Sequence, residues 1–232
     1  MKRAATEEAQ QAPALLEGRS SKGGRPSREV AAQLRNHLLE VALRAYCQHG
    51  LDGVTLSEIA QEAQVSKRTL YTRFKDRETL LVDAIEHGIE RLITPISTAI
   101  PDGTLRDQLL FLGGEMMQIS LRPEVIGLER LIALVQYRIP DVYQRVSGTI
   151  QKGRLSLIES LLSSAADRGE IEEESIHIAA SIVFDILVTQ PRRELLANPI
   201  AKGDATMMKA YLEKAIDLML YGIYLRPQQD SA

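Results

Sequence analysis

The chain has 232 residues, of which 44% are hydrophobic, 25% are charged and 4% are aromatic, and its formal net charge is −3. This length allows one large domain or two small ones, and we find neither the apolar run of about 20 residues that spans a membrane nor a signal-peptide core, so we expect a cytoplasmic protein. The single cysteine, Cys47, excludes an internal disulfide framework and a Cys-rich zinc site, while the abundance of Ala, Leu and Glu favours an all-α fold.

The charge is distributed unevenly along the chain. Residues 1–77 carry 13 Lys and Arg against 9 Asp and Glu, whereas residues 78–232 carry 15 against 22. A modest imbalance of this kind is common on protein surfaces, but the basic N-terminal part is where we expect an acidic partner such as nucleic acid to bind.

Four helices are predicted in the N-terminal part, after a polar segment, residues 1–24, that we expect to be a flexible arm. Apolar residues at three- and four-residue steps predict a first helix over Ser27–His49, and Gly50 follows as a stop. Thr55 and Glu58 form the Thr-x-x-Glu pattern of a capping box, which predicts a short helix over Leu56–Ala63.

Two further N-caps follow in this part of the chain. Ser66 is a suitable N-cap for a helix over Lys67–Phe74, and Asp76 is one for a helix over Arg77–Ile93. The two helices between Leu56 and Phe74 are too short to persist alone, so they must pack on the first helix. A compact three-helix unit is therefore predicted.

The remainder of the chain keeps a helical pattern that is interrupted by Pro and Gly. The interruptions, among them Pro191, predict five more helices near residues 104–120, 123–137, 141–167, 173–190 and 204–224. No repeat of 20–50 residues is evident, so a solenoid is not expected.

The segment Thr55–Phe74 has the layout of a helix-turn-helix, in which the second helix enters the major groove of DNA. If Leu70 and Phe74 face the core, Lys67 and Arg68 present to base edges, and Arg73 reaches a base or a phosphate. Thr55 and Ser66 lie at helix starts, where backbone N–H groups favour phosphate oxygens.

Residues 25–92, and above all GLDGVTLSEIAQEAQVSKRTLYTRFKDRETLL from Gly50 to Leu81, resemble the DNA-binding region of the TetR family of bacterial transcriptional regulators. The resemblance implies a helix-turn-helix domain over residues 25–76 and a ligand-binding and dimerisation domain over residues 77–232. It further implies that Thr55, Tyr71 and Arg77 hold phosphates and that Lys67, Arg68 and their neighbours read bases. The full set of expected DNA contacts is Thr55, Ser66, Lys67, Arg68, Thr69, Tyr71, Thr72, Arg73, Lys75 and Arg77.

The chain departs from the family pattern at two positions. Gln64 stands in the turn where the family has Gly, and a non-Gly residue in the left-handed conformation costs about 1 kcal/mol. Arg77 replaces the usual Lys and keeps its charge with a different geometry. In the arm, Lys22, Arg25 and Arg28 are similar to basic extensions that enter the minor groove in some relatives, but we favour a solvated, disordered tail.

The C-terminal part is expected to hold an inducer, and residues 124–198 more weakly resemble the C-terminal region of a TetR subgroup. The candidate ligand residues are Arg130, Tyr137 and Asp185. Asp185 lies in an apolar run and, if buried, must be paired or neutral. It equally fits an ion pair with Arg130 or Arg138, or an exposed or dimer-facing strip.

The functional interpretation is a small-molecule-responsive repressor that binds a palindromic operator in double-stranded DNA as a homodimer. The last helix carries an apolar stripe that suits either the core or a dimer seam, and we favour the seam. The stripe consists of Met208, Tyr211, Leu212, Ala215, Met219 and Ile223. An activator or dual regulator of the same fold and a sequence-indifferent architectural DNA binder are the alternatives. We expect no enzyme, cofactor or metal site, because the sequence lacks nucleophile, P-loop and metal-ligand patterns.

Overall fold

The computed structural model describes residues 28–93, 100–172, 176–197 and 205–221, and throughout these ranges the regular structure is helical. The arm over residues 1–24, with Lys22 and Arg25, lies outside the described residues. No helix within the described ranges combines the length and the apolar character that crossing a membrane requires.

The first four helices have nearly the bounds that their caps predict, and they are α1 (Arg28–His49), α2 (Leu56–Glu62), α3 (Lys67–Arg73) and α4 (Arg77–Leu92). Gly50 ends α1 with a φ of 71°, a left-handed conformation that glycine adopts without strain. The short helices α2 and α3 contribute Ile59, Ala60 and Leu70 to an apolar cluster with α1 and α4, which is the packing that such short helices require.

The remaining elements are α5 (Leu105–Ser120), α6 (Pro123–Arg138), α7 (Pro140–Asp167), α8 (Ile176–Phe184), the π-helix η2 (Asp185–Thr189), α9 (Gln190–Ala197) and α10 (Ala205–Tyr221). A second apolar cluster joins α5, the C-terminal part of α7, α8, η2 and α10. The first cluster also takes in α6 and the start of α7. The helix-turn-helix core is therefore continuous with the helices that lead into the C-terminal half.

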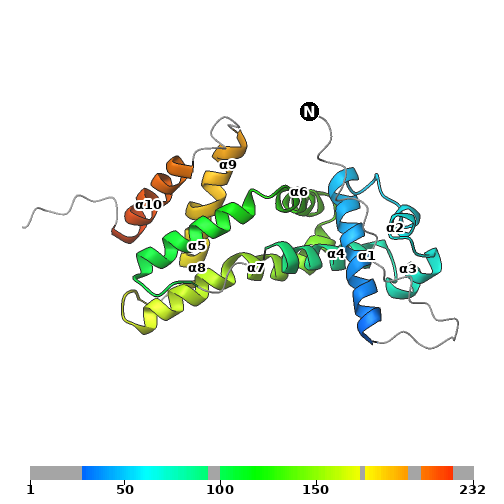
Figure 1. Cartoon of the computed structure of the whole chain (residues 1–232), viewed down its shortest axis with the longest axis horizontal. Coiled ribbons are helices and arrows are strands. Elements are labelled where there is room, and N and C mark those ends of the chain that lie inside the picture. Colours follow the sequence, from blue (N-terminus) through cyan, green and yellow to red (C-terminus); the bar gives the residue numbers. More distant parts are fainter. Residues whose placement is uncertain (1–27, 94–99, 173–175, 198–204, 222–232) are drawn as a thin grey trace, which may run out of the picture.

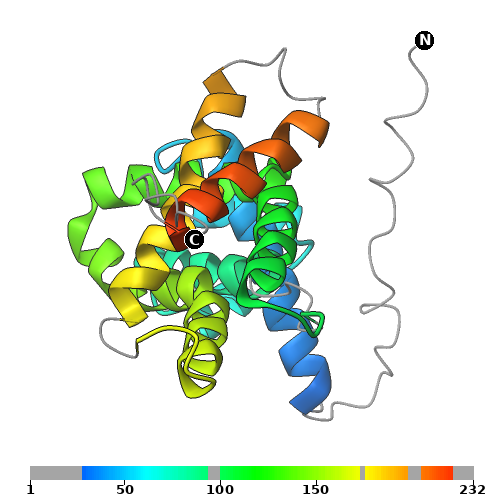
Figure 2. The same cartoon turned by 90° about the vertical axis from the view of Figure 1, so that its left-hand side faces the viewer.

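The molecule is elongated, with α2 and α3 at one end and α10 at the other (Figure 1). The 28-residue α7 runs between the two halves and packs against α4, α6 and α8. Seen from the α10 end, the helices of the C-terminal half form a bundle rather than a flat layer (Figure 2). This arrangement leaves α7 and α6 as the structural link between the C-terminal half and the first four helices.

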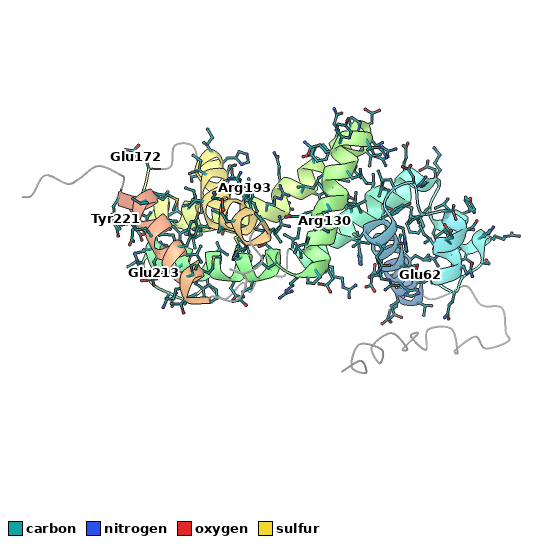
Figure 3. The ribbon with its side chains drawn as sticks, turned by 90° about the horizontal axis from the view of Figure 1, so that it is seen from above. Glu62, Arg130, Glu172, Arg193, Glu213 and Tyr221 are labelled. Carbon is teal, nitrogen blue, oxygen red and sulfur yellow. The ribbon has the colours of Figure 1, made fainter. Side chains whose placement is uncertain are left out.

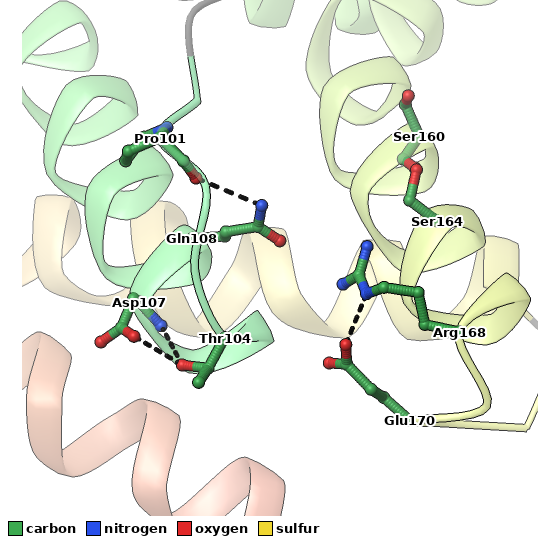
Figure 4. Close-up of polar contacts among 8 residues, drawn as sticks. All are labelled: Pro101, Thr104, Asp107, Gln108, Ser160, Ser164, Arg168 and Glu170. Atoms are coloured by element: carbon green, nitrogen blue, oxygen red, sulfur yellow. Dashed lines mark hydrogen bonds and ion pairs between the residues drawn. The ribbon is translucent and has the colours of Figure 1, made fainter.

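Side-chain caps fix the start of α5 close to the end of α7 (Figure 4). The Thr104 hydroxyl accepts a 3.2 Å hydrogen bond from the backbone N–H of Asp107 and donates one of 2.7 Å to its carboxylate. At the end of α7, Arg168 donates to Glu170 at 2.5 Å. The Thr104 cap thus defines where α5 begins, and the Arg168–Glu170 pair lies just beyond the end of α7.

The prediction that Pro191 ends a helix is wrong, because α8, η2 and α9 follow one another without interruption from Ile176 to Ala197. A proline inside an α-helix clashes with the carbonyl four residues earlier and leaves it without its N–H partner. Here η2 widens the preceding turn, and Gln190 N–H donates to Asp185 O, five residues back. A π-turn is a recognised way to absorb such a mismatch.

Candidate nucleic-acid interface

The interface begins with two capped helix starts. Thr55 caps α2, since its backbone N–H donates to Glu58 Oε2 at 2.7 Å and its hydroxyl oxygen accepts from Glu58 N–H at 3.2 Å. Ser66 caps α3, where its hydroxyl oxygen accepts from Thr69 N–H at 3.1 Å. The capping box and the Ser66 cap predicted from the sequence are confirmed.

The turn between α2 and α3 has the geometry that the family resemblance implies. Gln64 has a φ of 54°, in the left-handed region. Gln64 N–H donates to Gln61 O at 3.0 Å, and Val65 N–H donates to Ala60 O at 2.9 Å. These two bonds form a Schellman motif, which normally carries glycine at the position of Gln64. The turn is therefore formed although Gln64 stands where the family has Gly. Gln64 adopts the strained left-handed backbone conformation that the sequence predicts.

Helix α3 turns one side to the core and the other to solvent. Leu70 and the following Phe74 are each 1% exposed, as the sequence predicts. Lys67, Arg68 and Tyr71 are exposed. The outward side of α3 thus presents two cations at its N-terminal end and the phenol hydroxyl of Tyr71 one turn later.

Four other predicted contact residues have partners within the protein or remain open to solvent. The hydroxyl of Thr72 donates to Arg68 O at 2.6 Å, and that of Thr69 lies 2.8 Å from Ser66 Oγ. Arg73 is half-buried and donates to Ala31 O on α1 at 3.3 Å. Lys75 is exposed. Arg73 is therefore held against α1, whereas Lys75 is available to a polyanion.

The start of α4 completes the candidate interface. Asp76 caps the helix by accepting from Thr79 N–H at 2.7 Å, and this backbone hydrogen bond lowers the pKa of the Asp76 carboxyl. The pKa of Glu58 is lowered in the same way, by the backbone N–H of Thr55. Arg77 follows Asp76 and is exposed, at a helix N-terminus where backbone N–H groups also attract anions.

A small cavity of about 190 Å³ lies between this helix start and the C-terminal half. Its wall includes the Asp52–Arg138 ion pair, whose N–O distance is 3.0 Å. The residues that line it are Leu51, Asp52, Arg77, Glu78, Leu81, Arg138 and Ile139. Known small-molecule sites are larger, at roughly 300 Å³ and above, so this cavity suits water or a small ion better than an inducer.

The three predicted ligand residues lie on exposed surfaces. Arg130, Tyr137 and Asp185 are all exposed, and Tyr137 is 86% exposed. Figure 3 shows Arg130 in the middle region of the molecule, between Glu62 and Arg193. Since α6 turns Leu128 and Val135 into the core, positions 130 and 137 face away from it.

Asp185 is accordingly not a buried carboxylate. It follows the exposed Ile178 and Ile182 along one side of α8, at the seven- and three-residue steps that place residues on one face. Of the interpretations left open by the sequence, the exposed strip agrees with the structure. None of the three candidates lines the 190 Å³ cavity.

The sequence gives little sign of an ion cluster that the structure brings together in the C-terminal half. Glu129 of α6 forms ion pairs with Arg192 of α9 and, at 3.7 Å, with Arg154 of α7. No regular spacing links these three positions, so only the fold shows that they meet. Among the described residues, no group of three or more His, Cys, Asp or Glu is arranged to hold a metal ion.

Two known families match the chain. Residues 38–84 match the bacterial regulatory proteins of the tetR family, and residues 107–223 match the C-terminal domain of AefR-like transcriptional repressors. The first match contains the entire α2–turn–α3 segment and the start of α4. The second match covers half of the chain and most of its C-terminal helices.

Individual proteins give the same result. The chain is 32% identical over 139 residues to an HTH-type transcriptional regulator of Mycobacterium tuberculosis, which is 60% of this chain and 66% of that relative's length. A TetR-family regulator of Mesorhizobium loti superposes with a TM-score of 0.72 at 22% identity, covering 84% of this chain and 98% of that one. FadR of Bacillus subtilis, solved in complex with stearoyl-CoA, gives 0.58 at 18% identity, covering 81% and 98%.

Proposed function

Because the chain belongs to the TetR family of bacterial transcriptional regulators, we propose that it is a repressor that binds a palindromic operator as a homodimer and releases it when a small molecule binds the C-terminal half. The observation that carries the DNA-binding part is the outward side of α3. Lys67, Arg68 and Tyr71 are exposed there, on a helix held by a Schellman turn and the Ser66 cap. An exposed basic helix of this kind fits the major groove.

The contacts divide by role. We assign base reading to Lys67 and Arg68, which lie at the N-terminal end of α3. We assign phosphate binding to Tyr71 of α3 itself and to Thr55 and Arg77, which lie at the starts of α2 and α4. The surface is completed by Ser66, Thr69, Thr72, Arg73 and Lys75. Phosphate contacts position a protein on DNA, and base contacts specify the sequence.

Exposed apolar side chains at the opposite end support the homodimer. Ile178 is 60% exposed and Ile182 is 51% exposed on α8, and Leu218 of α10 is 42% exposed. Ile178 and Ile182 lie one turn apart on α8, and adjoining exposed apolar side chains mark interaction sites. A two-fold dimer formed there presents two α3 helices, and such symmetry requires two half-sites related by a palindrome.

The repressor mechanism is a shift between two arrangements of the dimer. A ligand that binds more tightly when the two α3 helices are wrongly spaced lowers operator affinity by the same factor as its preference. The complex of FadR with stearoyl-CoA supports ligand binding to this fold, and the match to AefR-like repressors supports repression.

The test is to select fragments of the source genome with the purified protein and measure their affinity against a scrambled duplex at one salt concentration. We expect a palindromic motif bound at least about 1,000-fold more tightly than the scrambled duplex. In a transcription assay, placing that motif over a promoter should lower transcription. Uniform weak binding to both duplexes would contradict a specific regulator, and increased transcription would contradict repression.

A further inference from the structure

The ion cluster of Glu129, Arg154 and Arg192 is built into the C-terminal half at the meeting point of α6, α7 and α9. The Glu129 and Arg192 side chains are 19% and 17% exposed, and that of Arg154 is 36% exposed. Arg192 Nε also donates to Ser120 O at the end of α5, at 3.0 Å. Four helices therefore share one polar cluster away from the DNA-binding surface.

The cluster has more positive than negative charge. Two guanidinium groups face a single carboxylate, and the buried Nε of Arg154 donates to no acceptor among the described residues. A partly buried charge without full compensation is costly. An incoming anion beside Arg154 would therefore be favourable. It would compete with Glu129 for both guanidinium groups, each of which is well suited to hold a carboxylate or a phosphate.

The surroundings of the two arginines are apolar. The guanidinium of Arg154 lies 5.9 Å from the ring centre of Phe184. One turn along α7, Ile158 is buried, and one turn before Arg192, Val188 of η2 is buried in the same apolar cluster. Apolar side chains thus lie within one helical turn of both arginines, which suits a ligand that carries a hydrocarbon part beside its anion.

The cluster adjoins the contacts that join the C-terminal half to the first four helices. Immediately before Glu129, Leu128 packs against Gly88 of α4, where an added Cβ would lie 3.2 Å from the leucine side chain. Immediately before Arg154, Gly153 lies so close to Ile89 of α4 that a Cβ would approach it to 2.7 Å. A movement of the cluster residues would therefore occur next to the side chains that pack against α4.

We propose that Arg154 and Arg192 bind the anionic head group of an amphiphilic effector, which replaces Glu129 as their partner. This inference rests on the proposed ligand-responsive function and adds the chemical class of the ligand. When Glu129 loses its partners, α6 is no longer tied to α7 and α9. Movement of α6 then displaces Leu128 against α4, which changes the position of the helix-turn-helix.

The test uses three probes with the same ten-carbon chain on the full-length protein, namely decanoate, decyl phosphate and decanol, all below their micelle concentrations. We expect at least one anion to bind at least about tenfold more tightly than decanol, as charge-assisted hydrogen bonds to an arginine predict. Comparing decanoate with decyl phosphate identifies the head group. Equal binding of anions and alcohol would overturn the proposal.

Matched variants assign the anion preference to the cluster. Arg192→Met should abolish it, whereas Arg193→Met, which removes the same charge from the exposed neighbouring position, should retain it. Glu129→Gln should tighten anion binding about tenfold, since the competing carboxylate is removed. If Arg192→Met fails to fold, Arg154→Lys, which keeps the charge and loses the planar fork, should weaken the preference. Retention of the full preference in Arg192→Met or in Arg154→Lys would contradict the assignment.

Operator affinity, measured in the same preparations, separates this inference from the proposed function. Specific operator binding that the preferred anion weakens at least about tenfold in the wild type, and not in Arg192→Met, supports both. Specific operator binding with no anion effect overturns the effector assignment alone. Loss of sequence preference without any probe overturns the proposed function itself.

Discussion

Gln64 holds a left-handed backbone conformation, with a φ of 54°, in the turn that sets the angle between α2 and α3. The conformation costs a non-Gly residue about 1–2 kcal/mol, and glycine avoids this cost. Glycine loses more conformational entropy on folding, however, which offsets part of the gain in stability. We expect Gln64→Gly to raise the free energy of unfolding by up to about 1 kcal/mol. Urea denaturation measures the change.

The matched control for this substitution is Gln61→Gly, in the last turn of α2. Gln61 is exposed and helical, so glycine there should lower stability by about 1 kcal/mol. Equal losses of stability in both variants would contradict the left-handed conformation of Gln64.

Arg68 and Arg77 differ in what they are expected to contact, and their alanine variants should differ in the same way. Arg68→Ala should relax the preference at one base position by about 1–3 kcal/mol. Arg77→Ala should weaken binding to operator and scrambled duplex alike and reduce the salt slope by about one. Fluorescence anisotropy across a salt series measures both, and an Arg77→Ala effect confined to the operator would refute the phosphate assignment.

Cys47 lies half-buried on α1 against α6, and desolvation raises the pKa of its thiol from 9.0 to about 11. Because the thiolate is the reactive form, the reaction with Ellman's reagent at pH 8 should be about 100-fold slower than in the denaturant-unfolded protein. The rate should increase about tenfold for each pH unit below that pKa. A plateau near pH 9 would show that the thiol is not desolvated.

At the scale of the helix, the sequence predicts the features that depend on neighbouring residues, such as the helix starts. The caps at Thr55, Ser66 and Asp76 place the starts of α2, α3 and α4 correctly, because each depends on residues three positions apart. The continuation through Pro191 was not predictable, since it depends on the π-turn of η2. The exposure of Asp185 was one of several alternatives that the sequence left open. Its neighbours are almost all apolar, so periodicity does not identify the buried face.

The caps predict how the first four helices respond to acid. Backbone N–H bonds lower the pKa values of Asp76 and Glu58, so their stabilisation is present above the unfolded-state pKa of about 4 and is lost as the pH falls through the lower folded values. We expect the wild type to melt at a higher temperature than Asp76→Asn at pH 7, and this difference to shrink by pH 3. Thermal melts at both pH values measure it.

The control for the acid response is Glu90→Gln, an exposed carboxylate on the same helix that caps nothing in α4. Its difference from the wild type should change less between pH 7 and pH 3. If Asp76→Asn and Glu90→Gln behaved identically, the α4 cap would not be the source of the acid response.

At the scale of the whole molecule, the two halves depend on contacts between distant parts of the chain. The all-α architecture and the helix-turn-helix were predictable, because one helix-turn-helix pattern spans consecutive residues. The Glu129, Arg154 and Arg192 cluster was not, since its members are separated by 25 and 38 positions. Its existence depends on how α6, α7 and α9 pack, and helix packing leaves no fixed spacing in the sequence.

The proposed dimerisation through the end opposite α3 concerns the whole molecule, and α8 allows it to be tested. Ile182 is 51% exposed there, and a carboxylate in an apolar interface remains without a partner. We expect Ile182→Glu to convert the homodimer to a monomer in sedimentation velocity and to weaken operator binding at least about 100-fold, because the second half-site contact is no longer intramolecular.

Ala133→Glu adds the same charge to the exposed side of α6 and should change neither quantity. An Ile182→Glu protein that stays dimeric would exclude this face as the interface, whereas a monomer with full operator affinity would show that the dimer is not needed for DNA recognition.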